Sequence, residues 1–214
     1  MKVIKIFLVL VMIVFLSGCS KLEDLSYDQI IGNFNIKSKD ANTYKKGYKF
    51  YVPKGLKISD AGSNYVILTS SDVNYYMYID LVSYKEKKTL TYENNNNSVY
   101  SQKIKNGDIN GYIEIKLWEN DKYLIEIMYN YAKIEVMVDK GLVNKALVNS
   151  ISILNSIKYD DKVIKTILEQ DDLPYMEEVF NMFEETQNNS NYLDYENIEI
   201  KDEEEKIKDT DYIN

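Results

Sequence analysis

The sequence predicts an α+β fold, in which an antiparallel sheet of about six to seven strands is covered by a C-terminal helix. Three observations predict it. Short segments rich in β-branched and aromatic residues recur between residues 48 and 138. The gaps between them are mostly short, which favours antiparallel hairpins over parallel crossovers. Between residues 142 and 157 the apolar spacing then changes to a helical period.

The strands are expected at residues 48–52, 65–69, 73–84, 99–104, 112–118, 123–129 and 132–138. Pro53-Lys54-Gly55 follows the first of them, and Asn106-Gly107 and Asn110-Gly111 supply turn residues later in the chain. The segment 73–84 alternates in polarity, so we expect its side chains to point to opposite faces of the sheet. One face would carry Val73, Tyr75, Met77, Ile79 and Leu81, and the other Asn74, Tyr76, Tyr78 and Asp80.

Two expected hairpins fix the register of the last three strands. A two-residue loop at Asn120-Asp121 would place Glu119 opposite Lys122 and Trp118 opposite Tyr123. A turn centred on Asn130-Tyr131 would pair Ile127 with Ile134, Ile125 with Val136, and Glu126 with Glu135.

The segment 142–157 reads as one amphipathic helix. Its apolar residues form a continuous stripe at helical spacing: Val143, Ala146, Leu147, Ile151, Leu154 and Ile157. A strand, the turn in "FYVPKGLKI", several hairpins and then a C-terminal helix resemble the layout of PsbP/Mog1-like α+β sandwiches. The resemblance concerns topology alone and covers residues 48–158.

The N-terminus has the layout of a signal helix. Lys2 and Lys5 precede an uninterrupted apolar run from Ile6 to Leu16, about 16 Å of helix and about half the thickness of a bilayer core. Leu16, Ser17, Gly18 and Cys19 follow the pattern Leu-small-Gly/Ala-Cys, and Cys19 is the only cysteine.

This pattern resembles the lipobox of bacterial lipoproteins, which signal peptidase II recognises. The resemblance covers residues 1–20. It implies that Leu16, Ser17 and Gly18 direct removal of residues 1–18, and that the Cys19 thiol carries diacylglycerol. The protein would then be held by lipid on the extracytoplasmic face of the cell membrane. The alternative is a plain N-terminal membrane anchor with a chance cysteine at its end.

The mature chain divides into three parts. Residues 19–43 are expected to be a lipidated tether, residues 44–159 the α+β domain, and residues 160–214 an acidic tail. From Glu169 onward there are 16 acidic residues and 3 lysines, a net charge of −13, whereas residues 20–168 carry 18 acidic residues and 21 lysines, a net charge of +3.

The tail is expected to be partly helical, with an amphipathic helix at about 173–186. Asp172-Leu173-Pro174 is typical of a helix start. An apolar stripe follows, consisting of Met176, Val179, Phe180 and Phe183. The stripe would dock on the protein's own sheet or in the groove of a partner protein.

Composition excludes several kinds of chemistry. There is no histidine, all 26 basic residues are lysines and there is one cysteine, so Ser-His-Asp triads, Cys-His dyads, His-ligated metals and disulfides are excluded. Nucleic-acid binding is not expected of an exported acidic protein without arginine. No metal and no other cofactor is expected. Glu126 and Glu135 face each other and could share a proton, bind a divalent cation, or act as acid and base on a sugar. The simpler interpretation is two exposed sheet residues, flanked by Lys133, that pair with lysines.

The aromatic residues Tyr76, Tyr78, Tyr84, Tyr112 and Trp118 are the candidate binding face. Such a face would stack on sugars or peptides, unless a helix or the tail covers it. Two functions therefore stay open besides a rare carboxylate hydrolase. The first is a non-enzymatic, lipid-anchored exported protein that presents a small α+β interaction domain at the membrane. The alternative is a solute- or glycan-binding lipoprotein that uses the Tyr/Trp face.

Overall fold

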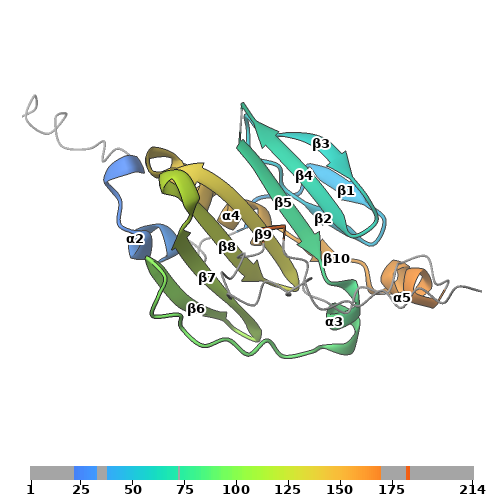
Figure 1. The fold of residues 1–214 in the computed structure, drawn as a ribbon. Helices are drawn as coiled ribbons and strands as arrows, with labels where there is room; N and C mark the ends of the chain where they lie inside the picture. Colours follow the sequence, from blue (N-terminus) through green and yellow to red (C-terminus); the bar gives the residue numbers. More distant parts are fainter. Residues whose placement is uncertain (1–21, 33–37, 72, 170–181, 184–214) are drawn as a thin grey trace, which may run out of the picture. The chain divides into compact units, whose positions relative to one another are not determined.

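The computed structural model describes residues 22–32, 38–71, 73–169 and 182–183. Its main feature is a seven-stranded sheet with the order β3-β4-β5-β9-β8-β7-β6, in which all neighbours are antiparallel (Figure 1). The strands are β3 (Lys57–Ala61), β4 (Tyr65–Ser70), β5 (Val73–Ile79), β6 (Tyr100–Asn106), β7 (Ile109–Leu117), β8 (Lys122–Tyr129) and β9 (Ala132–Asp139). The predicted α+β class is confirmed, with β3 as a strand that was not predicted.

A second, three-stranded sheet was also not predicted. It consists of β1 (Thr43–Lys45), β2 (Tyr48–Phe50) and β10 (Lys158–Tyr159), in the order β1-β2-β10. The expected strand at 48–52 therefore lies outside the main sheet. Ser156, just after the C-terminal helix, accepts a hydrogen bond from the backbone N–H of Tyr51 at 2.7 Å, which ties the small sheet to the end of that helix.

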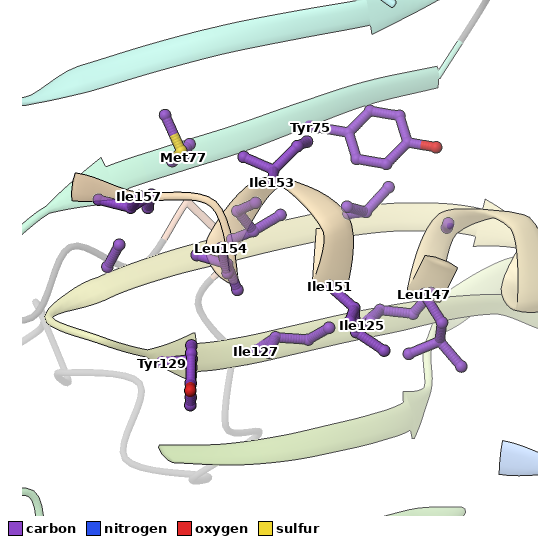
Figure 2. Close-up of a cluster of buried hydrophobic side chains, with 14 of the residues drawn as sticks. Tyr75, Met77, Ile125, Ile127, Tyr129, Leu147, Ile151, Ile153, Leu154 and Ile157 are labelled. Carbon is purple, nitrogen blue, oxygen red and sulfur yellow. The ribbon is translucent and has the colours of Figure 1, made fainter. Parts of the chain in front are cut away.

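Helix α4 (Val143–Leu154) packs on one face of the main sheet and confirms the predicted C-terminal helix. All six residues of the predicted apolar stripe are buried. Figure 2 shows Leu147 and Ile151 next to Ile125 of β8, and Ile153 next to Tyr75 and Met77 of β5. The apolar period of the sequence thus marks the centre of the core.

The two hairpin predictions have different outcomes. The β8–β9 turn centres on Asn130-Tyr131, whose positive φ angles of 52° and 58° suit a two-residue turn, and the predicted pairings are confirmed. The β7–β8 prediction is wrong. A 3₁₀ turn, η3 (Glu119–Asp121), joins these strands, so Tyr123 pairs with Leu117 instead of Trp118.

Strand β5 is shorter than the predicted 73–84. Tyr75 and Met77 lie on the core face as predicted, but the strand ends at Ile79. The side chain of Asp80 then accepts a hydrogen bond from the backbone N–H of Ser83 at 2.8 Å and caps helix α3 (Leu81–Glu86). This cap explains why the alternating pattern does not continue as a strand.

The segment predicted as a tether is partly folded onto the domain. It contains η1 (Leu22–Asp24), helix α2 (Tyr27–Ile31) with a Ser26–Gln29 capping box, and buried Ile30 and Ile31. Helix α2 contacts α4. The predicted domain boundary at residue 44 is therefore wrong, because the apolar pair at 30–31 belongs to the core.

The folded part also extends beyond the predicted end at Tyr159. Helix α5 (Asp161–Glu169) buries Ile164 and Ile167. Gly47, between β1 and β2, has a φ of +91°, and a Cβ atom there would lie 3.0 Å from Cγ1 of Ile164. This close approach places α5 against the small sheet, so residues 161–169 are not part of a separate tail.

Within the described ranges, no helix has the length and apolar character needed to cross a membrane. The apolar run 6–16 lies outside those ranges.

Candidate functional site

Three glutamates lie side by side on the outer face of the main sheet, the face opposite α4. Glu114 of β7 pairs with Glu126 of β8, and Glu126 pairs with Glu135 of β9, as the sequence predicted for the second pair. Glu114 and Glu135 are buried, with exposed fractions of 5% and 2%. Their burial contradicts the interpretation of Glu135 as an exposed sheet residue and requires compensating partners.

Glu135 has partners on two sides. The ammonium group of Lys133, also 2% exposed, donates to Oε1 of Glu135 at 2.8 Å. Oε2 accepts hydrogen bonds from the backbone N–H groups of Met182 at 2.7 Å and Phe183 at 3.3 Å. The Phe183 ring meets Tyr76 edge-on, with ring centroids 5.5 Å apart. Met182 and Phe183 of the predicted tail therefore lie on this part of the outer face.

The connection between α3 and β6 covers the other end of the glutamate row. Oε1 of Glu114 accepts hydrogen bonds from Asn95 and Ser98, and Oε2 accepts one from the Tyr92 hydroxyl at 3.2 Å. The Tyr92 ring stacks on Tyr112 with centroids 4.1 Å apart. The asparagine-rich segment, expected only as a loop, thus acts as a cover for β7.

The glutamates are held as hydrogen-bond acceptors. Tyr112 donates its hydroxyl to Oε1 of Glu126. Burial, and next the neighbouring Glu126 carboxylate, raise the pKa of Tyr112, which keeps this phenol a donor. In the described ranges no group of histidine, cysteine, aspartate or glutamate side chains has an arrangement that could hold a metal ion. Since their oxygens face structural donors, the row does not form an open acid–base pair.

The five predicted aromatic residues do not form one exposed face. Tyr76 and Tyr112 are covered as described above, and Tyr78 is only 7% exposed. Tyr84 lies in α3 instead of the sheet. Trp118 lies just before η3, at one end of the sheet. The sequence prediction of a continuous Tyr/Trp binding face is therefore wrong.

A cleft of about 620 Å³ lies instead at the other end of the sheet. It lies between α3, the segment that follows α3, the β6–β7 hairpin and the β8–β9 turn. Its volume is in the range of small-molecule sites. Its lining combines aromatic, hydroxyl, amide and charged groups: Asp80, Ser83, Tyr84, Lys87, Lys88, Thr89, Leu90, Thr91, Asp108, Ile109, Asn110, Met128, Asn130 and Tyr131.

Tyr84 is the one predicted face residue that lines this cleft. Its ring stacks on Tyr159 at 4.0 Å, meets Tyr131 edge-on at 5.5 Å, and has the Lys87 ammonium 3.7 Å from its centroid. Its hydroxyl donates to Oδ1 of Asp161 at 2.7 Å. Burial, and next this hydrogen bond, raise the pKa of Tyr84 to about 12. Tyr84 is therefore held in the cleft wall by contacts with Tyr131, Tyr159, Lys87 and Asp161.

Other predicted site residues lie outside the described ranges: Leu16, Ser17, Gly18, Cys19, Met176, Val179 and Phe180. Of the predicted docking helix, Phe183 is described, and there the backbone forms a bend instead of a helix. Phe183 does contact the protein's own sheet, which is the intramolecular option considered for that helix.

Comparison of the chain with protein-family models, with curated proteins and with solved structures finds no match. The resemblances to bacterial lipoproteins and to PsbP/Mog1-like domains stay predictions.

Sequence reasoning missed Glu114 and its cover. Glu114 lies opposite Glu126 on the neighbouring strand, so the correct pairing of β7 with β8 would have predicted the row of three glutamates. Tyr92 and Asn95 gave no periodic signal, because a covering loop follows no regular spacing.

Proposed function

We propose that the protein is a non-enzymatic, lipid-anchored exported protein that presents its α+β domain at the extracytoplasmic face of the cell membrane. The observation that carries the proposal is Leu16-Ser17-Gly18-Cys19 directly after an apolar run, with the chain's only cysteine at the position that receives lipid. Several acyl chains on one cysteine give a firm anchor, because each buried CH₂ contributes about 0.8 kcal/mol.

The arrangement of the outer face supports a role without catalysis. The three carboxylates of the row each accept hydrogen bonds from the protein itself. Two of the predicted aromatic residues are covered by other parts of the chain. The surface that is left for contacts at the membrane is therefore elsewhere on the domain.

Replacement of the lipid acceptor tests the proposal. Cys19→Ser is expected to leave an unprocessed precursor without label when cells are fed a fatty-acid analogue. Ser17→Ala is the matched control, because it changes the same motif but keeps a small residue, and it should be labelled and processed like the wild type. A Cys19→Ser protein that is cleaved and fractionates like the wild type would contradict the proposal.

The cleft favours a second candidate, a lipoprotein that binds a small polar solute or glycan. Tyr131 and Lys87 supply an aromatic ring and a charged group of the kind that such ligands need. The test is a ¹³C-methyl methionine NMR titration of the mature chain with N-acetylglucosamine oligomers. The NMR signal of the Met128 methyl, in the cleft, should shift. The signal of the Met137 methyl should not, because Met137 lies toward the opposite end of the sheet. Equal or absent shifts for both methyls would remove this candidate for these glycans.

A further inference from the structure

Several connections lie together at one end of the main sheet. Leu117 pairs with Tyr123, and Lys122 pairs with Asp139, so the β7–β8 turn and the β9–α4 connection lie at the same end. That connection is η4 (Lys140–Leu142). The start of the described chain lies beside the β9–α4 connection, because Asn144, two residues after Leu142, donates a hydrogen bond to Leu22 (Figure 1). We name this the Leu22 end of the sheet.

The N-terminal segment is fixed at this end by hydrogen bonds. Asn144, in the first turn of α4, donates through Nδ2 to the carbonyl oxygens of Leu22 and Leu25, both at 2.9 Å. Helix α2 follows this segment, and its Ile30 side chain is buried in the core. The position where the chain leaves the domain toward Cys19 is therefore defined by the fold.

The Leu22 end carries half of the exposed large apolar side chains in the described ranges. A single exposed apolar residue needs no explanation, but a group at one end of a domain indicates a contact surface. The group comprises Leu22 (37% exposed), Val99 (51%), Leu117 (57%) and Leu142 (38%). Trp118, a residue type enriched where apolar and aqueous phases meet, lies next to Leu117 and is partly exposed.

The covalent distance to the lipid is short. Leu22 follows Cys19 by three residues, which span at most about 11 Å when fully extended. Each headgroup layer of a bilayer is roughly 5–7.5 Å thick, since the full bilayer measures about 40–45 Å and its hydrocarbon core about 30 Å. A chain anchored at Cys19 can cross the headgroup layer but cannot hold the Leu22 end far above it.

We propose that the Leu22 end docks in the headgroup layer of the membrane that holds Cys19, with Leu117, Trp118 and Leu142 in contact with lipid. This inference rests on the proposed lipid anchor. It places the cleft, which lies at the Asn130-Tyr131 end of the sheet, on the side that faces away from the membrane.

The charges at the Leu22 end determine which lipids it prefers. Acidic residues there are Glu23, Asp24, Glu119, Asp121 and Asp139, and basic residues are Lys122, Lys140 and Lys145. Lys122 is paired with Asp139 at 2.6 Å. These five acidic and three basic residues give a net charge of −2, so anionic headgroups repel this end weakly and docking depends on apolar contact.

The test uses the full lipidated protein in phosphatidylcholine vesicles, with and without phosphatidylglycerol. Because lipid occupies the Cys19 thiol, a spin label on Leu117→Cys or Leu142→Cys has a single attachment site. Lys105→Cys, also exposed but near the opposite end of the sheet, is the matched control. Circular dichroism verifies that each variant is folded.

The Leu117 and Leu142 labels are expected to be several-fold more accessible to oxygen, relative to a water-soluble nickel complex, than the Lys105 label. Because this end carries a net negative charge, vesicles with phosphatidylglycerol should give the same difference or a smaller one, and not a larger one. If all three labels are equally accessible to nickel while the protein stays on the vesicles, the docking proposal is wrong and the anchor stands. If Cys19 itself takes up the spin label and the protein leaves the membrane, the anchor is wrong and the docking proposal with it.

Discussion

Truncation of Ile30 distinguishes a folded N-terminal segment from a tether. Ile30 is fully buried and lies in α2, which contacts α4. Ile30→Ala removes three carbon atoms, about 2.4 kcal/mol of transfer free energy at about 0.8 kcal/mol each. The cavity adds to this, so we expect the free energy of unfolding to fall by about 3–4 kcal/mol, within the usual range for such changes. A tether residue would give a change near zero.

The measurement is urea unfolding of a chain that starts at Ser20, followed by far-UV circular dichroism and by the fluorescence of Trp118. Asp24→Ala is the control, because Asp24 is exposed in the same segment and its truncation should change stability by about 0.5 kcal/mol or less. At roughly 2–4 °C per kcal/mol, Ile30→Ala should lower the melting temperature by about 6–16 °C. A loss for Ile30→Ala no larger than that of the control would refute the packing of this segment.

Three further predictions concern the outer face and the cleft wall. Lys133→Met should lower the free energy of unfolding by about 3–5 kcal/mol, because it leaves the buried Glu135 carboxylate without its cation. Adding Glu135→Gln should recover part of that loss. If the effects of the two substitutions on urea unfolding are additive, this coupling is contradicted. The amide hydrogen of Met182 should be protected from exchange, as measured by NMR, and Phe183→Asp should abolish the protection; rapid exchange in the wild type would show that the contact does not persist. The pKa of Tyr84 is raised from 10.0 to about 12, so above pH 10 the unfolded chain releases this proton first and stability falls as pH rises toward 12. The Tyr84→Phe variant should lose less stability over that range. If the free energy of unfolding falls equally with pH in both proteins, the pKa of Tyr84 is not shifted.

The parts of the fold that could be predicted are those that a local pattern determines. The apolar stripe of α4 and the turn at Asn130-Tyr131 each depend on residues close together in the sequence, and both are confirmed. The β7–β8 hairpin shows the limit of this reasoning. Its turn adopts a 3₁₀ conformation with a positive φ at Asn120 and Asp121, and one extra residue in the loop moves the pairing from Trp118 to Leu117.

What could not be predicted depends on contacts between distant segments. Ile30 and Ile164 lie in short polar stretches and are buried only because α4 and the small sheet offer apolar surfaces to them. The prediction of the aromatic binding face was wrong for the same reason. Alternation correctly separated Tyr76 from the core face, but it gives no information on whether Tyr92 or Phe183 comes to cover that side.

The chemical identity of the mature N-terminus tests the proposed lipid anchor most directly. Trypsin cleaves after Lys21, so digestion of protein extracted from membranes releases Cys19-Ser20-Lys21 as a separate peptide. We expect mass spectrometry to find this peptide starting at Cys19 and carrying diacylglycerol on the thiol. An unmodified Cys19, or a mature chain that starts at any other residue, would contradict the lipid anchor at Cys19.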